Sequence, residues 1–232
     1  MNAESQHRRR VLLISLAVLT ALVAATAIAV KSPLLDVEHV NVVGAPSERA
    51  AAVRKAAGVE VGDSIALFLP GRAAARVRAL PWVADASVTR SLPSTVTITV
   101  TPRPAVGWAR AGDQFAVVDR SSRVMYRVDQ QPGGVPELVG ARHVAAAGGT
   151  VRPSTLARAA AGLVPELRVR SAALGIDHGA LTVQVVGGPQ VRFGAPTDIP
   201  TKARVAAAVL ASLGGAPVQY VDVGVPAAPV SG

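Results

Sequence analysis

The longest apolar stretch of the chain lies near its N-terminus. Residues Val11 to Val30 carry no charge, and their only polar side chains are the hydroxyls of Ser15, Thr20 and Thr26. At about 1.5 Å of rise per residue, a helix of this length spans about 30 Å, which is the thickness of the hydrocarbon core of a bilayer. The pattern therefore predicts a transmembrane helix at residues 11–30.

Charged residues flank this segment unequally. An arginine triplet at residues 8–10 precedes it, whereas Lys31 is followed by the acidic Asp36. Because positively charged flanks stay in the cytoplasm, residues 1–10 are predicted to be a cytoplasmic tail and the bulk of the chain to lie on the extracytoplasmic side. Residues 27–29, Ala-Ile-Ala, leave open a cleaved signal peptide, although such peptides have apolar cores of only about 7–15 residues.

The next segment passes from strand to helix periodicity. β-branched residues at 37–43 predict a strand. A helix is predicted at 48–57, after the candidate N-cap Ser47 and before Gly58, a suitable C-terminal residue. A second helix, with apolar residues at helical spacing, ends at Pro81.

Two further strands are predicted at 82–90 and 95–101, joined by the turn at 91–94. The second strand alternates strictly between β-branched apolar residues and threonines. Such alternation is typical of a strand with one buried and one solvated face. Val96, Ile98 and Val100 are predicted to be buried, and Thr95, Thr97, Thr99 and Thr101 to face water.

Beyond residue 103 the pattern consists of short strands, tight turns and isolated helices. Ser154 is a candidate N-cap, Pro165 is expected to interrupt or end the helix that follows, and Asp177-His178-Gly179 is predicted to be a turn. Strands are predicted at 115–118, 124–128, 181–186, 191–193 and 218–225, and helices at 156–162 and from Pro200 to about Leu213. The predicted fold class is α+β, with a mixed β domain that carries one or two helices.

Several stretches of the chain carry a resemblance to a known family. They are Val40 to Gly44, Gly58 to Gly62, Leu80 to Arg90 and Leu92 to Val96. Together with the strand, helix, helix, strand, strand order, they resemble the POTRA domain of the FtsQ/DivIB family of bacterial cell division proteins. The later stretch Arg192-Phe193-Gly194, before a helix that carries Lys202, resembles the β domain of the same family. The resemblance implies a POTRA domain at 33–102, an FtsQ-type β domain at 103–226 and a flexible tail at 227–232.

Composition and motifs narrow the function classes. The chain has 24 Lys+Arg against 15 Asp+Glu, a net charge of +9, but its basic residues outside the N-terminal triplet are scattered singly. Nucleic-acid binding is therefore disfavoured, because it requires a clustered basic surface. There is no cysteine, no phosphate loop and no nucleophile elbow, so we expect no enzyme activity, no cofactor and no small-molecule substrate. No metal is expected either, because the four histidines have no metal-ligand spacing: His7, His39, His143 and His178.

The two tryptophans have two interpretations each. Either could be an anchor in a protein interface. Because Trp82 follows the helix-breaking Pro81, the favoured interpretation for Trp82 is that it covers the core of the POTRA-like segment.

The resemblance implies that the chain is a non-catalytic, membrane-anchored scaffold at the division septum. Its expected partners are other single-pass division proteins of the FtsB and FtsL types. The alternative is another membrane-anchored POTRA protein that serves secretion or envelope assembly by binding extended polypeptides. The last predicted strand is the candidate docking site, because it is short, bears little charge and lacks the lysines that protect an exposed strand edge. An internal position of this strand in the sheet remains the second interpretation. The candidate partner-binding residues are Tyr220, Val221, Asp222, Val223, Gly224 and Val225.

Overall fold

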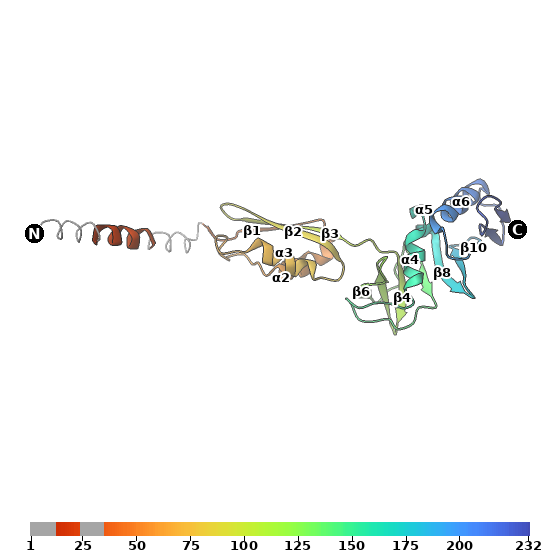
Figure 1. The fold of residues 1–232 in the computed structure, drawn as a ribbon, viewed down its shortest axis with the longest axis horizontal. Helices are drawn as coiled ribbons and strands as arrows, with labels where there is room; N and C mark the ends of the chain where they lie inside the picture. The colour runs from red at the N-terminus through yellow and green to blue at the C-terminus, as the bar shows by residue number, and fades with distance from the viewer. Residues whose placement is uncertain (1–12, 24–34) are drawn as a thin grey trace, which may run out of the picture. The chain divides into compact units, whose positions relative to one another are not determined.

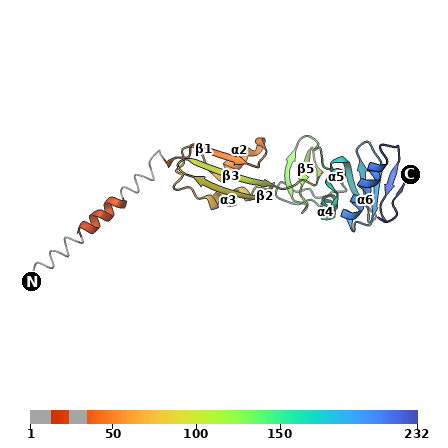
Figure 2. The ribbon, with the colours of Figure 1, turned by 90° about the horizontal axis from the view of Figure 1, so that it is seen from above.

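The computed structural model describes residues 13–23 and 35–232. The chain divides into two compact units, of which the first ends at Pro102 and the second begins at Arg103. Figures 1 and 2 show the two units from directions 90° apart. We call them the N-terminal and the C-terminal unit.

Residues 13–23 are helical, and their leucine, isoleucine and valine side chains are exposed. Within the residues that the structure describes, no helix is both long enough and apolar enough to cross a membrane. The other residues of the predicted transmembrane span, 11–12 and 24–30, lie outside the described residues. So do the predicted cytoplasmic tail at 1–10 and the candidate cleavage site at 27–29.

The N-terminal unit has one three-stranded sheet, and its helices lie on one face of that sheet (Figures 1 and 2). The strands are in the order β1-β3-β2, with β1 parallel and β2 antiparallel to β3. The predicted order of strands and helices is confirmed. The elements are β1 (His39–Val43), the short 3-10 helix η2 (Ser47–Arg49), α2 (Ala50–Ala57), α3 (Pro70–Arg78), β2 (Val83–Ser91) and β3 (Thr95–Pro102).

In the first helical segment, η2 and α2, the predicted C-terminal residue is confirmed and the predicted N-cap is wrong. The N-cap assignment of Ser47 is wrong: η2 has no side-chain cap, and the Ser47 hydroxyl donates instead to the neighbouring Glu48 carboxylate (3.4 Å). The extended backbone of Pro46 already directs the chain into η2, so Ser47 is its first residue. Gly58 does end α2, in the left-handed conformation that glycine adopts without a Cβ clash (φ 58°).

The predicted register of β3 is confirmed. Val96 and Ile98 are fully buried and Val100 is 3% exposed, whereas the alternating threonines are half-buried or exposed. Trp82, directly before β2, is also buried, and the Arg49 guanidinium lies 5.3 Å from the centre of its ring. Trp82 therefore belongs to the core of this unit.

The C-terminal unit contains a nine-stranded mixed sheet in the order β12-β11-β10-β9-β8-β7-β4-β5-β6. Its helices α4, α5 and α6 pack with the inward side chains of the sheet in one apolar core, which includes Leu156, Leu174 and Phe193. The strands are β4 (Gly107–Ala111), β5 (Gln114–Val118), β6 (Val124–Val128), β7 (Glu137–Val139), β8 (Ser171–Asp177), β9 (Ala180–Val185), β10 (Gln190–Gly194), β11 (Tyr220–Asp222) and β12 (Val230–Ser231); the helices are α4 (Ser154–Gly162), α5 (Pro165–Arg170) and α6 (Ile199–Ser212).

The predicted turns and helix ends of the C-terminal unit are confirmed only in part. The tight turn at Asp177-His178-Gly179 is confirmed between β8 and β9, with His178 and Gly179 both at positive φ. Ser154 is the first residue of α4, after Pro153, and does not cap it. Pro165 begins α5 because its fixed φ and missing N–H suit a first helical turn. The strands β4, β7, β8 and β12 and the helix α5 were not predicted.

Candidate functional site

The candidate docking strand lies near one end of the C-terminal sheet. β11 runs parallel to β10, with Val221 opposite Val191 and Asp222 opposite Arg192. The Val223 N–H donates to the Arg192 carbonyl (2.8 Å), which extends this pairing one residue beyond β11. Val221 and Val223 are fully buried. One side of the strand is therefore anchored to the sheet by both backbone pairing and burial.

The other side of β11 is occupied by the end of the same chain. β12 pairs with it antiparallel, and Tyr220 and Gly232 exchange backbone hydrogen bonds of 3.0 and 3.2 Å. The prediction that the last strand is an unpaired edge is wrong in this respect. Because a two-residue strand such as β12 has no readable periodicity, the sequence pattern could not show this pairing.

The six candidate residues do not form one continuous strand. Tyr220, Val221 and Asp222 make up β11, and the chain then turns. The Asp222 carboxylate accepts a hydrogen bond from the Gly224 N–H (2.8 Å), which stabilises this turn. Val225 is 64% exposed beyond it. The turn returns the chain towards β11, where β12 pairs with it.

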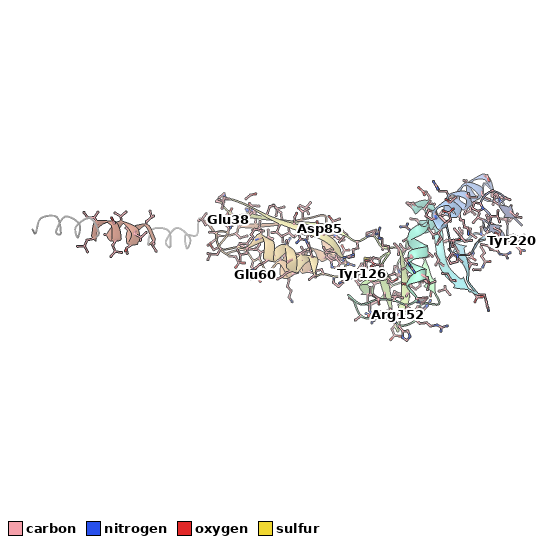
Figure 3. All side chains as sticks on the ribbon, viewed as in Figure 1. Glu38, Glu60, Asp85, Tyr126, Arg152 and Tyr220 are labelled. Atoms are coloured by element: carbon pink, nitrogen blue, oxygen red, sulfur yellow. The ribbon has the colours of Figure 1, made fainter. Side chains whose placement is uncertain are left out.

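The exposed surface of this region carries an arginine that the sequence reasoning did not assign to the site. The Arg192 guanidinium on β10 stacks over the Tyr220 ring, with its carbon 4.2 Å from the ring centre. Its Nε also donates to the Gln190 side chain (3.3 Å). Figure 3 labels Tyr220 at this end of the unit. Tyrosine and arginine are both enriched in protein–protein interfaces.

A buried lysine supports the same end of the sheet. Lys202 of α6 is only 6% exposed, and its ammonium donates to the carbonyls of Phe193 (2.8 Å) and Ala195 (3.0 Å). A buried charge requires such partners, because desolvation otherwise disfavours it strongly. Lys202 thus ties α6 to the end of β10.

The described residues contain no group of three or more His, Asp or Glu side chains that could hold a metal ion. The geometry at β11 instead consists of backbone groups, one aromatic ring and one guanidinium. This arrangement can bind an extended polypeptide, and it provides no nucleophile with an adjacent base.

Comparison with known proteins identifies the family. Residues 35–103 match the family model of the POTRA domain, FtsQ-type. The cell division protein FtsQ of Streptomyces collinus is 31% identical over 211 residues, which cover 86% of this chain and 79% of that protein. The chain belongs to the FtsQ family of cell division proteins.

Two other FtsQ proteins show the same extent of similarity. FtsQ of Streptomyces coelicolor is 31% identical over 84% of this chain and 76% of its own length. FtsQ of Streptomyces bingchenggensis is 29% identical over 96% of this chain and 86% of its own length. Matches of this length take in the C-terminal unit as well as the POTRA domain. The resemblance to the FtsQ family that the sequence motifs suggested is therefore confirmed.

Proposed function

We propose that this chain is a non-catalytic, membrane-anchored scaffold of the division machinery. Its C-terminal unit binds other single-pass division proteins, of the FtsB and FtsL types, by strand addition at β11. The observation that supports this is the asymmetry of β11. Its inner side pairs with β10, whereas its outer side pairs only with the two-residue β12.

Strand addition at this position means that a partner strand replaces β12. The backbone groups of Tyr220 and, by the alternation of an antiparallel pair, those of Asp222 face β12. A partner strand satisfies the same groups and in addition offers side chains to the ring of Tyr220 and the guanidinium of Arg192. Pairing supplies affinity, and these neighbouring side chains select the partner.

Membership of the FtsQ family favours division over the alternative role in secretion or envelope assembly. In this proposal residues 11–30 form the anchor, residues 1–10 lie in the cytoplasm, and both folded units act on the extracytoplasmic side at the division septum. The topology is tested with two single cysteines, because the chain has none of its own. Cysteine at Ser47 should react with an impermeant thiol reagent in intact cells, and cysteine at Ser5 should not. The reverse pattern of labelling would exclude this topology.

Proline substitution tests docking at β11, because each proline removes one N–H group that points to a known side. Asp222→Pro removes a group that faces β12, whereas Val223→Pro removes the donor to the Arg192 carbonyl of β10. We expect Asp222→Pro to melt close to the wild type but to lose partner capture. Val223→Pro should lower the melting temperature of the C-terminal unit. The measurement is co-purification of FtsB- and FtsL-type proteins from membranes beside thermal melting.

Asp222→Ala is the matched control, because it keeps the backbone N–H but, like the proline variant, loses the carboxylate that accepts from Gly224. It should capture the partner as the wild type does. Wild-type capture by Asp222→Pro would place the docking surface elsewhere, with the POTRA domain as the next candidate. Unfolding by Asp222→Pro but not by Asp222→Ala would contradict the outward direction of the Asp222 N–H group.

A further inference from the structure

A second candidate site lies in the C-terminal unit, where three chain segments converge. The Val151 N–H donates to the Ser122 carbonyl (2.9 Å), which joins residues 150–154 to the turn between β5 and β6. On its other side, the same segment pairs with Arg142 through Arg152. These segments line an open cavity of about 570 Å³. In the sheet order β5 and β6 lie at the opposite end from β11, and Figure 3 labels Arg152 and Tyr220 far apart in this unit.

Two arginines face each other directly at this cavity. Arg142 and Arg152 exchange both backbone hydrogen bonds (2.6 and 3.2 Å), so they form a hydrogen-bonded antiparallel pair. Side chains opposite each other in such a pair project from the same face, and like charges placed this way are destabilising. Within the described part of the chain, neither guanidinium has an ion pair or a hydrogen-bond partner. An anion bound between them would remove this repulsion.

The remaining lining residues supply donors and no negative charge. They include His143, Thr150 and the first residue of α4, Ser154, whereas Ser121 already donates to Asp119. The nearby Asp119 is 2% exposed and is already engaged, since its carboxylate accepts from Ser121, from the Arg123 N–H and from the Arg103 guanidinium. The Asp119 carboxylate is therefore buried and already hydrogen-bonded to these three residues.

We propose that this cavity binds a phosphate group. Two guanidiniums can each present two parallel N–H groups to one anion, and the hydroxyls and His143 add further donors. A carboxylate has only two oxygens and is satisfied by one such guanidinium. A phosphate carries more strong acceptor oxygens on a tetrahedral centre and can accept from both. The phosphate can come from a free phosphate or monoester, or from the phosphodiester of an anionic polymer. This site does not depend on the proposed docking at β11.

The test is binding of inorganic phosphate to the full chain in detergent, measured by calorimetry at constant ionic strength. The wild type should bind saturably. Arg142→Gln and Arg152→Gln should each weaken binding by about tenfold or more, because each removes charged hydrogen bonds. The phosphate affinity of Arg142→Lys should lie between the affinities of the Gln variants and the wild type, since lysine keeps the charge but not the paired N–H donors of the guanidinium. Arg158→Gln, an exposed arginine of α4 outside the cavity lining, loses the same charge and should bind as the wild type.

Three outcomes would overturn the proposal. The first is that the wild-type chain shows no saturable phosphate binding. The second is that Arg158→Gln and Arg152→Gln lose binding equally, which would indicate an adventitious ion only. The third is that acetate binds as tightly as phosphate. The first needs no variant, so a variant that fails to fold leaves the proposal testable. A parallel titration with glycerophosphodiester identifies the source. Tighter binding than with inorganic phosphate assigns the site to a polymer, and weaker binding assigns it to free phosphate or a monoester.

Discussion

The two units build their sheets from strands of very different length. In the POTRA domain β2 and β3 have nine and eight residues and pair along nearly all of them. In the C-terminal unit β11 has three residues and β12 has two, and β4 joins β7 through the single pair Trp108 and Glu137. The POTRA sheet thus combines one long hairpin with the parallel pairing of β1 to β3, which joins segments far apart in the sequence. The larger sheet joins its hairpins through several short pairings between distant segments.

This difference determines how much backbone pairing is lost when a strand of each unit is displaced. Replacing a long central strand such as β3 would break two sets of pairings and expose its buried valines. Replacing β12 breaks only a few backbone hydrogen bonds at a site where Val230 is already 56% exposed. Short terminal strands with exposed hydrogen bonds open at low free energy. The C-terminal sheet therefore ends in a segment that should open at a lower free energy than the strands of the POTRA domain.

The sharpest test of the comparison is a core substitution in the POTRA hairpin. Ile98 is fully buried, so Ile98→Ala should lower the free energy of unfolding of this unit by about 2–5 kcal/mol. Thr99→Ala, on the exposed face of the same strand, should stay within about 0.5 kcal/mol. Chemical denaturation of both variants measures this. Equal effects of the two substitutions would contradict the register of β3.

The next largest effect is expected at the buried lysine of the C-terminal unit. Lys202→Met keeps the apolar stem but leaves the carbonyls of Phe193 and Ala195 without their donor. We expect a loss of about 1–3 kcal/mol in the unfolding of this unit, with the POTRA transition unchanged. Arg204→Met, on the exposed side of the same helix, is the control and should have little effect. A shift of both transitions would mean that the two units do not unfold separately.

Removal of residues 227–232 tests whether β12 is displaceable. It deletes the pairing of β11 with β12, whose own two residues are exposed, and should cost about 1 kcal/mol or less. Capture of the partner should become stronger, because the partner no longer competes with β12. Loss of capture in this variant would show that residues 227–232 themselves contact the partner. Unfolding of the C-terminal unit would show that β12 is an essential strand.

The smallest effect concerns an exposed ion pair of the POTRA domain. The hydrogen bond from the Arg78 guanidinium (2.8 Å) lowers the pKa of Asp85 below its usual value of 3.8. Because folding lowers the pKa of Asp85, the ion pair stabilises the folded state at pH values above the unfolded-state pKa. This stabilisation is lost as the pH falls through the folded-state pKa. NMR titration of the Asp85 carboxyl should show the low pKa, and Arg78→Gln should return it towards 3.8. An unchanged pKa in Arg78→Gln would rule out Arg78 as the main cause.

The sequence by itself determined the elements whose signal is local. Strict alternation placed Val96, Ile98 and Val100 on the buried face, because successive residues of a strand point to opposite sides. Gly58 marked a helix end, because a left-handed C-terminal residue favours glycine. The motifs around these positions were also sufficient to indicate the FtsQ family, which the comparisons then showed.

Only the tertiary structure decided how the C-terminal unit is assembled and what its candidate sites contain. The three-residue β7 is a strand because it lies between β4 and β8, and β12 exists because β11 has open backbone groups. The opposition of Arg142 and Arg152 likewise arises from pairing between segments ten residues apart. Such short pieces carry no hydrophobic period of their own, so their structure is determined by the neighbours with which they pair.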